Sequence, residues 1–271
     1  DYVRRQILGN DLLFQTPYGL RNMFYADYTA SGRGLRFIEE KLLRIQKSYA
    51  NTHTEDDYSG KYLTGLYHQA ETRIKSMVNA GKHGKIFPVG SGSTGALKKL
   101  QEIIGVYIPP LTRERLGPSR SKALAPVVFI GPYEHHTNEL MWRESLAEVV
   151  VVRLSGRGGL DLADLEEKIS APRFSRRIKF GSFSAGSNIT GVKTPVYDVA
   201  RICHRHKAAV FFDFAAVAPY AEIDMNRDGE SYFDALLFSP HKFLAGPGSS
   251  GILVIHEHLY RRDLPPTTAG G

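Results

Sequence analysis

Cysteine, tryptophan and long apolar runs are scarce in this chain of 271 residues, which contains one cysteine and one tryptophan. A lone cysteine excludes a disulfide within the chain, as is usual for proteins of reducing compartments. No run of about 18 or more apolar residues is present, so we expect no transmembrane helix. The charged N-terminal sequence DYVRRQILGND lacks the apolar segment of a secretory signal. We therefore expect a location in the cytoplasm or another reducing intracellular compartment.

Basic residues outnumber acidic ones, and the net charge of +7 raises the question of a nucleic-acid partner. The basic residues are scattered, however, and no recognised nucleic-acid-binding motif accompanies them. Their densest cluster, Arg113 to Lys122, contains proline, glycine and serine, and we interpret it as a solvated surface loop. We expect neither nucleic acid nor a membrane as a partner.

Short apolar runs alternate with helical periodicity through most of the chain. Strands that are apolar on both faces and separated by helices indicate a largely parallel sheet between two helical layers. The last strand follows its predecessor too closely for a helical crossover, so we expect it to run antiparallel. The predicted strands are a short one beginning at Met23, then 85–89, 126–130, 148–154, 177–184, 208–214, 235–238 and 251–255, and the predicted helices are 37–49, 61–80, 94–104, 136–146, 162–169 and 196–206.

The sequence thus predicts a three-layer α/β/α domain with a mainly parallel seven-stranded sheet over residues 23–271. Residues 1–22 show no long periodicity and are expected to form an N-terminal arm or a short helix.

Lys242 directly follows the apolar strand 235–238, in the segment SPHKFLAGPGSSG. A lysine at the mouth of a buried strand is costly unless it is paired or used in chemistry. The hydroxyl of Ser239, the imidazole of His241 and nearby backbone N–H groups suggest a bound anion. A Schiff-base lysine beside a phosphate is what pyridoxal phosphate requires, although a surface lysine in a turn would leave the same pattern.

Ligands of open parallel sheets bind at the carboxyl ends of the strands, where this chain places further polar groups. The segment GSGSTG, residues 90–95, opens a helix and offers glycines, the hydroxyls of Ser93 and Thr94, and free N–H groups to a phosphate. The same segment matches the dinucleotide-binding motif G-x-G-x-x-G, which leaves a nicotinamide-dependent oxidoreductase as an alternative. In dinucleotide-binding proteins that motif is followed about 20 residues later by an acidic residue. Here the basic loop occupies that region, which argues against the alternative.

Three other strand ends carry groups that a planar anionic cofactor would use. His135 could face an aromatic ring, whereas His135 and His136 together would point to opposite faces and make a poor metal site, so we predict no metal. Asn188 could donate its amide to a ring oxygen, or form an Asx turn. Asp213 ends a buried strand and needs a cationic partner, either a protonated pyridine nitrogen or a lysine or arginine of the chain.

From about Tyr25 onward, the order and spacing of these segments resemble the class V aminotransferase family of pyridoxal-phosphate enzymes, especially its cysteine desulfurase-like members. The motifs that carry the resemblance are EHHTN at 134–138, SNITG at 187–191, Asp213, and SPHK at 239–242. It implies the large domain of fold type I, the aspartate aminotransferase-like fold. It also implies a homodimer with the active site near the interface, an amino-acid substrate, and sulfur transfer from L-cysteine. A transaminase, an epimerase, a β-lyase or a non-catalytic scaffold of the same fold remain alternatives.

The resemblance also implies roles for individual residues. Lys242 would form the Schiff base with the cofactor, and His135 would stack on the ring and assist proton transfers. Asp213 would pair with the pyridine nitrogen, and Asn188 would bond the ring oxygen. The phosphate would be held by Ser93, Thr94, Ser239 and His241.

His53 occupies the position of a histidine that family members bring near the substrate, a weaker match. Ala216 stands where many members have a glutamine, which removes one bond to the ring oxygen. Cys203 lies within a predicted helix, and we expect it to pack rather than react. Desulfurases carry their sulfur-accepting cysteine and an arginine for the substrate carboxylate in a smaller C-terminal domain, which we expect to lie beyond residue 271. We therefore expect this chain alone to be incomplete as an enzyme.

Overall fold

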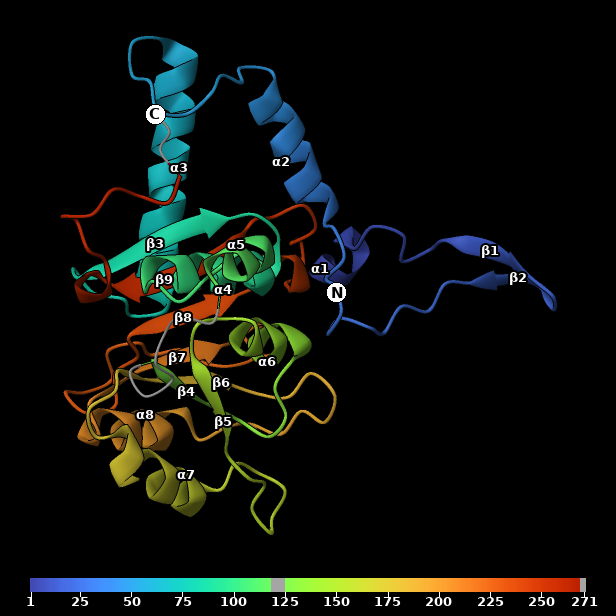
Figure 1. Ribbon diagram of the computed structural model, residues 1–271. Coiled ribbons are helices and arrows are strands. Elements are labelled where there is room, and N and C mark those ends of the chain that lie inside the picture. The colour runs from blue at the N-terminus through green and yellow to red at the C-terminus, as the bar shows by residue number, and fades with distance from the viewer. Residues whose placement is uncertain (118–124, 269–271) are drawn as a thin grey trace.

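The computed structural model describes residues 1–117 and 125–268, and its centre is a seven-stranded sheet in the order β3-β9-β8-β7-β6-β4-β5 (Figure 1). Only β9 runs against its neighbours in this sheet, pairing antiparallel with β3 and β8. The strands are β3 (Gly84–Val89), β4 (Val127–Ile130), β5 (Glu148–Val151), β6 (Lys179–Ser184), β7 (Ala208–Asp213), β8 (Ala235–Phe238) and β9 (Gly251–His256). The predicted sheet, its seven strands and the reversed direction of the last strand are confirmed.

Helices cover both faces of this sheet, which confirms the predicted three-layer arrangement. On one face lie α4 (Gly92–Ile103) and α6 (His136–Arg143). The other face carries α7 (Leu162–Ile169), α8 (Val196–Arg205) and the end of α3 (Tyr58–Met77). Within β4, Val128 packs in the core on the face covered by α4 and α6, and Phe129 packs in the core on the face covered by α7 and α8. Successive side chains of a strand point to opposite faces of the sheet. Both residues are fully buried.

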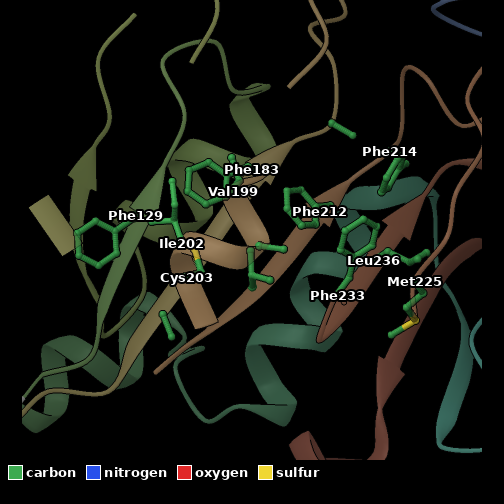
Figure 2. Packing of buried hydrophobic residues seen from close by; sticks show 14 of the residues in the cluster. Phe129, Phe183, Val199, Ile202, Cys203, Phe212, Phe214, Met225, Phe233 and Leu236 are labelled. Atoms are coloured by element: carbon green, nitrogen blue, oxygen red, sulfur yellow. The ribbon is translucent and has the colours of Figure 1, made fainter. Parts of the chain in front are cut away.

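Aromatic side chains fill much of the core on the face covered by α7 and α8 (Figure 2). Phe212 of β7 contacts Phe233 with ring centroids 4.6 Å apart, and Phe183 of β6 lies next to it at 6.3 Å. Cys203 of α8 is fully buried in the same cluster. Each such phenyl ring stabilises the fold by roughly 1.5 to 3 kcal/mol through burial alone. The well-packed sheet therefore holds the loops at the ends of its strands in fixed positions.

The N-terminal residues form α1 (Tyr2–Gln6) and a hairpin of β1 (Leu13–Thr16) and β2 (Gly19–Asn22) that projects from the main body (Figure 1). The expected short strand beginning at Met23 is wrong, since residues 23–27 are irregular. Phe24 is 92% exposed, so the apolar residues that suggested a strand are not packed against the sheet. The next helix, α2 (Arg36–Gln46), has no buried residue.

The basic segment at 113–122 is not wholly a loop, because α5 (Pro110–Leu116) includes its first residues. Pro110 suits the first position of a helix, where no backbone N–H is needed. Arg113 bonds the side chain of Glu144 just after α6, which draws α5 towards that helix. Residues 118–122 lie outside the described residues. None of the helices described is long and apolar enough to cross a membrane.

Candidate functional site

A cavity of about 300 Å³ lies at the carboxyl ends of β4, β6, β7 and β8. Parallel strands end at one edge of a sheet, which is why residues distant in sequence meet there. All the predicted cofactor-binding residues line this cavity, namely Ser93, Thr94, His135, Asn188, Asp213, Ser239, His241 and Lys242. The structure thus gathers groups that the sequence could only place at separate strand ends.

One end of the cavity is formed by the start of α4 and the loop after β8. The hydroxyl of Ser239 accepts a bond from the Ser93 backbone N–H at 2.8 Å and lies 3.0 Å from the Ser93 hydroxyl. Gly92 has a φ of +58°, and a Cβ there would lie 2.8 Å from His241 Cε1. Only glycine suits this position. Hydroxyls, an imidazole and a helix N-terminus therefore converge where a phosphate could bind.

Asp213 ends β7 and is 5% exposed. Its Oδ1 accepts a bond from the backbone N–H of Ala215 at 2.8 Å. Among the residues that the structure describes, no ion pair involves Asp213, which excludes the alternative of a salt bridge with a described lysine or arginine. Burial raises the pKa of this carboxyl, although the bonds from Ala215 and Ser93 and the positive charge of Lys242 act against that rise.

Lys242 ends the short 3-10 helix η2 (Pro240–Lys242), directly after β8. This loop is fastened to an N-terminal segment, because the N–H of Gly32 donates to the His241 carbonyl at 2.8 Å and the N–H of Ala245 donates to the Arg33 carbonyl at 2.7 Å. A Cβ on Gly32 would lie 1.8 Å from the Phe243 carbonyl oxygen. Sequence reasoning missed this attachment, and the small residues Ser31 and Gly32 were its only signal.

His135 stands at the start of α6, where its Nδ1 accepts a bond from the Thr137 N–H at 3.2 Å. Thr137 in turn bonds the hydroxyl of Thr94 at 2.9 Å, so the beginnings of α4 and α6 are joined across the cavity. Capping of the helix fixes the direction of the imidazole.

The turn that carries Asn188 is held by its neighbour. The buried Ser187 hydroxyl accepts from the N–H groups of Ile189 and Thr190, both at 3.2 Å. The turn is therefore a serine turn rather than the Asx turn considered as an alternative for Asn188. Asn188 lines the cavity, where its amide could bond a ligand oxygen.

Glu134 is a residue of this region to which sequence reasoning gave no role. Its carboxylate accepts bonds from the N–H of Gly131 at 3.0 Å, the N–H of Ser184 at 2.8 Å and Nδ2 of Asn138 at 2.6 Å. Burial raises the pKa of Glu134 to about 7. Its place beside His135 in the chain was the available signal.

Of the three other positions discussed from the sequence, one lines the cavity and two do not. His53 is exposed, edge-on to Tyr67 at 6.3 Å, and is not among the residues that line the cavity, so its role stays a prediction. Ala216 does line the cavity. Cys203 is fully buried, and burial raises the pKa of its thiol, as suits a packing residue.

The groups around the cavity match the chemistry of pyridoxal phosphate. The phosphate-type cradle lies at Gly92 and Ser239, and Lys242 supplies an amine. Asp213 is a buried carboxylate without an ion-pair partner in the described part of the chain, and a protonated ring nitrogen would supply one. The fit of pyridoxal phosphate to the cavity therefore rests on the Asp213 carboxylate, which lacks an ion-pair partner among the described residues, as well as on the types of residue present.

Comparisons with known proteins agree with this geometry. A probable cysteine desulfurase of Halalkalibacterium halodurans is 28% identical over 92% of this chain and 57% of its own length. A second, from Aeropyrum pernix, is 27% identical over 93% of this chain and 56% of its own length. The chain thus spans little more than half the length of these relatives.

Solved structures show the same fold. The apo structure of a cysteine desulfurase from Thermococcus onnurineus NA1 matches with a TM-score of 0.74 at 21% identity, over 100% of this chain and 60% of the other. A NifS-like protein from Rickettsia africae ESF-5 matches with a TM-score of 0.71 at 16% identity, over 92% and 61%. The family model for aminotransferase class-V matches residues 24–271. The chain belongs to the aminotransferase class-V family.

Proposed function

We propose that this chain is the cofactor-binding part of a pyridoxal-phosphate enzyme that acts on an amino acid. The observation that carries the proposal is the buried Asp213, which has no ion pair among the described residues and lines the same cavity as Lys242. A buried carboxylate is costly unless a cation meets it. A ring N–H⁺ would meet Asp213 and hold the cofactor in one orientation.

Each group of the cavity then has a task. Ser93, Thr94, Ser239 and His241 would bind the phosphate, and Asn188 would donate to the ring oxygen. His135 packs against the ring. When bound, the cofactor supplies an electron sink for the negative charge that forms at the substrate Cα. Lys242 would hold the cofactor aldehyde through Nζ, and its amine would be placed to move the α-proton of the substrate.

Desulfuration of L-cysteine is the reaction that we favour, because the relatives of similar sequence bear the name cysteine desulfurase. In that reaction the cysteine Cβ–Sγ bond breaks, an acceptor thiol takes the sulfur as a persulfide, and Cβ gains a proton to give alanine. Cys203 is the one cysteine of the sequence and is fully buried, so the acceptor thiol must come from outside these 271 residues. Transamination, epimerisation and β-elimination would use the same cavity.

We also propose that the protein is a homodimer. The amphipathic α2 has no buried residue, and its Leu42 and Leu43 are 47% and 61% exposed. A second copy could cover this apolar face. Sedimentation analysis should give twice the monomer mass, and a monomer at working concentrations would contradict the proposal.

The test of the cofactor is spectroscopic. The full chain is mixed with pyridoxal phosphate, and we expect a visible absorbance band that Lys242→Ala loses and that the surface variant Lys82→Ala, away from the cavity, keeps. Borohydride reduction should then attach the cofactor to the peptide containing Lys242. Absence of the band in the unmodified protein would overturn the proposal.

The reaction is tested by its products. The loaded protein is incubated with L-cysteine and a thiol, and alanine and sulfide are measured. Equal amounts of both support desulfuration. Pyruvate in place of alanine would instead indicate β-elimination, and exchange of the α-proton without either product would indicate epimerisation.

A further inference from the structure

Glu134 is a carboxylate beside the cavity that the proposed function leaves without a role. It directly precedes His135, and its oxygens lie where the end of β4, the end of β6 and the first turns of α6 meet. It accepts bonds from Gly131 after β4, from Ser184 of β6 and from Asn138 of α6. One side chain therefore ties together three elements beneath His135.

The direction of these bonds is fixed by the donors. Backbone N–H groups can only donate, and so can the indole N–H of Trp142, which bonds Asn138 Oδ1 at 3.1 Å. The Ser182 hydroxyl also bonds Asn138 Oδ1, at 2.6 Å. The Asn138 amide is thereby oriented with Nδ2 towards Glu134. The position requires a side chain whose two oxygens accept, which a carboxylate satisfies.

Burial and hydrogen bonding act in opposite directions on this carboxyl. Burial and, to a smaller extent, the negative charge of Asp213 raise the pKa of Glu134 to about 7, although the bonds from Ser184 and Asn138 act against that rise. The groups that face Glu134 from β6 and α6 are the neutral Ser184 and Asn138, and the ionisable group on β7 is Asp213. His135 follows in the same segment. The charge on Glu134 therefore changes near neutral pH without a direct cationic partner among these contacts.

We propose that Glu134 is a positioning residue of the site, which fixes His135 and the end of β6 and whose charge acts through Asp213 on the ring nitrogen of the bound cofactor. This inference rests on the proposed function. Ser184, whose N–H donates to Glu134, lies opposite Asp213 in the pairing of β6 with β7, so ionised Glu134 adds negative charge near Asp213 and would stabilise protonated, positively charged groups of the bound cofactor. A neutral side chain at 134 removes that stabilisation.

The test is a pH titration of the visible absorbance of the full chain loaded with pyridoxal phosphate. In Glu134→Gln we expect the midpoint to move to lower pH by several tenths of a unit. The control is Asp164→Asn, since Asp164 is a buried carboxylate of α7 that pairs with Arg153 and Lys168 and does not line the cavity. Its midpoint should stay at the wild-type value.

A second variant keeps the test decisive if Glu134→Gln fails to fold. Ser184→Ala removes one hydroxyl bond to Glu134 while the backbone bond remains, and it should move the midpoint in the same direction by less. A band whose midpoint is the same in wild type and in the variant that folds overturns the inference alone. A shift of equal size in Asp164→Asn also overturns it. Absence of any band in wild type overturns the proposed function and this inference with it.

Discussion

Asp213 and Asp234 are two equally buried carboxylates at opposite ends of neighbouring strands, and their surroundings differ. Asp234 directly precedes β8 and is 2% exposed, while Asp213 ends β7 and is 5% exposed. Asp234 bonds His204 and His258, both at 2.9 Å. Burial alone would raise its pKa, but these imidazoles and the Val210 N–H lower it.

The pKa of Asp213, by contrast, is raised, because no comparable set of donors offsets its burial. The difference separates a carboxylate whose partners are in the chain from one that lines a cavity without an ion-pair partner among the described residues. The first stabilises the fold, and the second is suited to a ligand.

The largest effect should follow removal of the structural carboxylate. Asp234→Ala leaves His204 and the Val210 N–H without their acceptor and should lower the free energy of unfolding by about 3 to 5 kcal/mol. Urea unfolding of the cofactor-free protein measures this loss. The folded fraction should still bind pyridoxal phosphate, and a loss below about 1 kcal/mol would break the comparison.

Asp213→Asn should weaken cofactor binding and leave the stability of the cofactor-free protein largely unchanged. Losing a charge-assisted bond to the cofactor weakens binding by about 1.5 to 3 kcal/mol, which is roughly 10- to 150-fold in the dissociation constant. The cofactor-free protein should be as stable as wild type or more so, because Asp213 has no ion pair to lose among the described residues. Unchanged affinity, measured by absorbance titration, would contradict its role.

Glu134 should make stability depend on pH in the cofactor-free protein. Its pKa is raised from 4.5 to about 7 on folding, so its contribution is fully present below pH 4.5 and is lost as the pH rises through about 7. The loss should be up to roughly 3 kcal/mol, because a pKa difference of one unit between the folded and unfolded states is worth about 1.4 kcal/mol. Asp213 and His204, whose pKa values are also raised, contribute losses of the same sign. Glu134→Gln isolates the part that comes from Glu134, and thermal unfolding between pH 4.5 and 8 should show a smaller decline in that variant.

The smallest effect should come from the more exposed partner of Asp234. His258 is 53% exposed and His204 is 14% exposed, so solvent screens the His258 pair more strongly. His258→Ala should cost about 0.5 to 1 kcal/mol, less than His204→Ala. Equal losses of unfolding free energy in His258→Ala and His204→Ala would show that solvent exposure does not determine how much each pair stabilises the fold.

The sheet could be predicted because its strands are short runs of apolar residues such as those around Phe129 and Phe212, and burial on both faces leaves that pattern in the sequence. The predicted cofactor-binding residues could be named because they lie at or shortly after strand ends or open a helix, and because the order of their motifs resembles the class V aminotransferase family. The structure gathers them around one cavity, while their individual roles remain predictions.

Other features depend on contacts that no local pattern records. The bonds of Glu134 require the orientation of Asn138, which depends on Trp142, and the fastening of the Lys242 loop requires Gly32. The expected strand at Met23 failed for a related reason, since an apolar run forms a strand only where the fold brings it a partner. Phe24, almost fully exposed, has none of the burial that the pattern suggested.

The reversed strand β9 has a consequence for how the chain assembles. β3 lies at one edge of the sheet and pairs with β9, which comes last among the strands. During synthesis β3 must therefore wait for roughly 160 further residues before its backbone finds a partner, and such long-range pairing is slow. Until then its unpaired edge is exposed to other chains. Residues 251–256 join β3 to the rest of the sheet, and a nascent chain that stops before them leaves both edges of β3 unpaired and prone to aggregation.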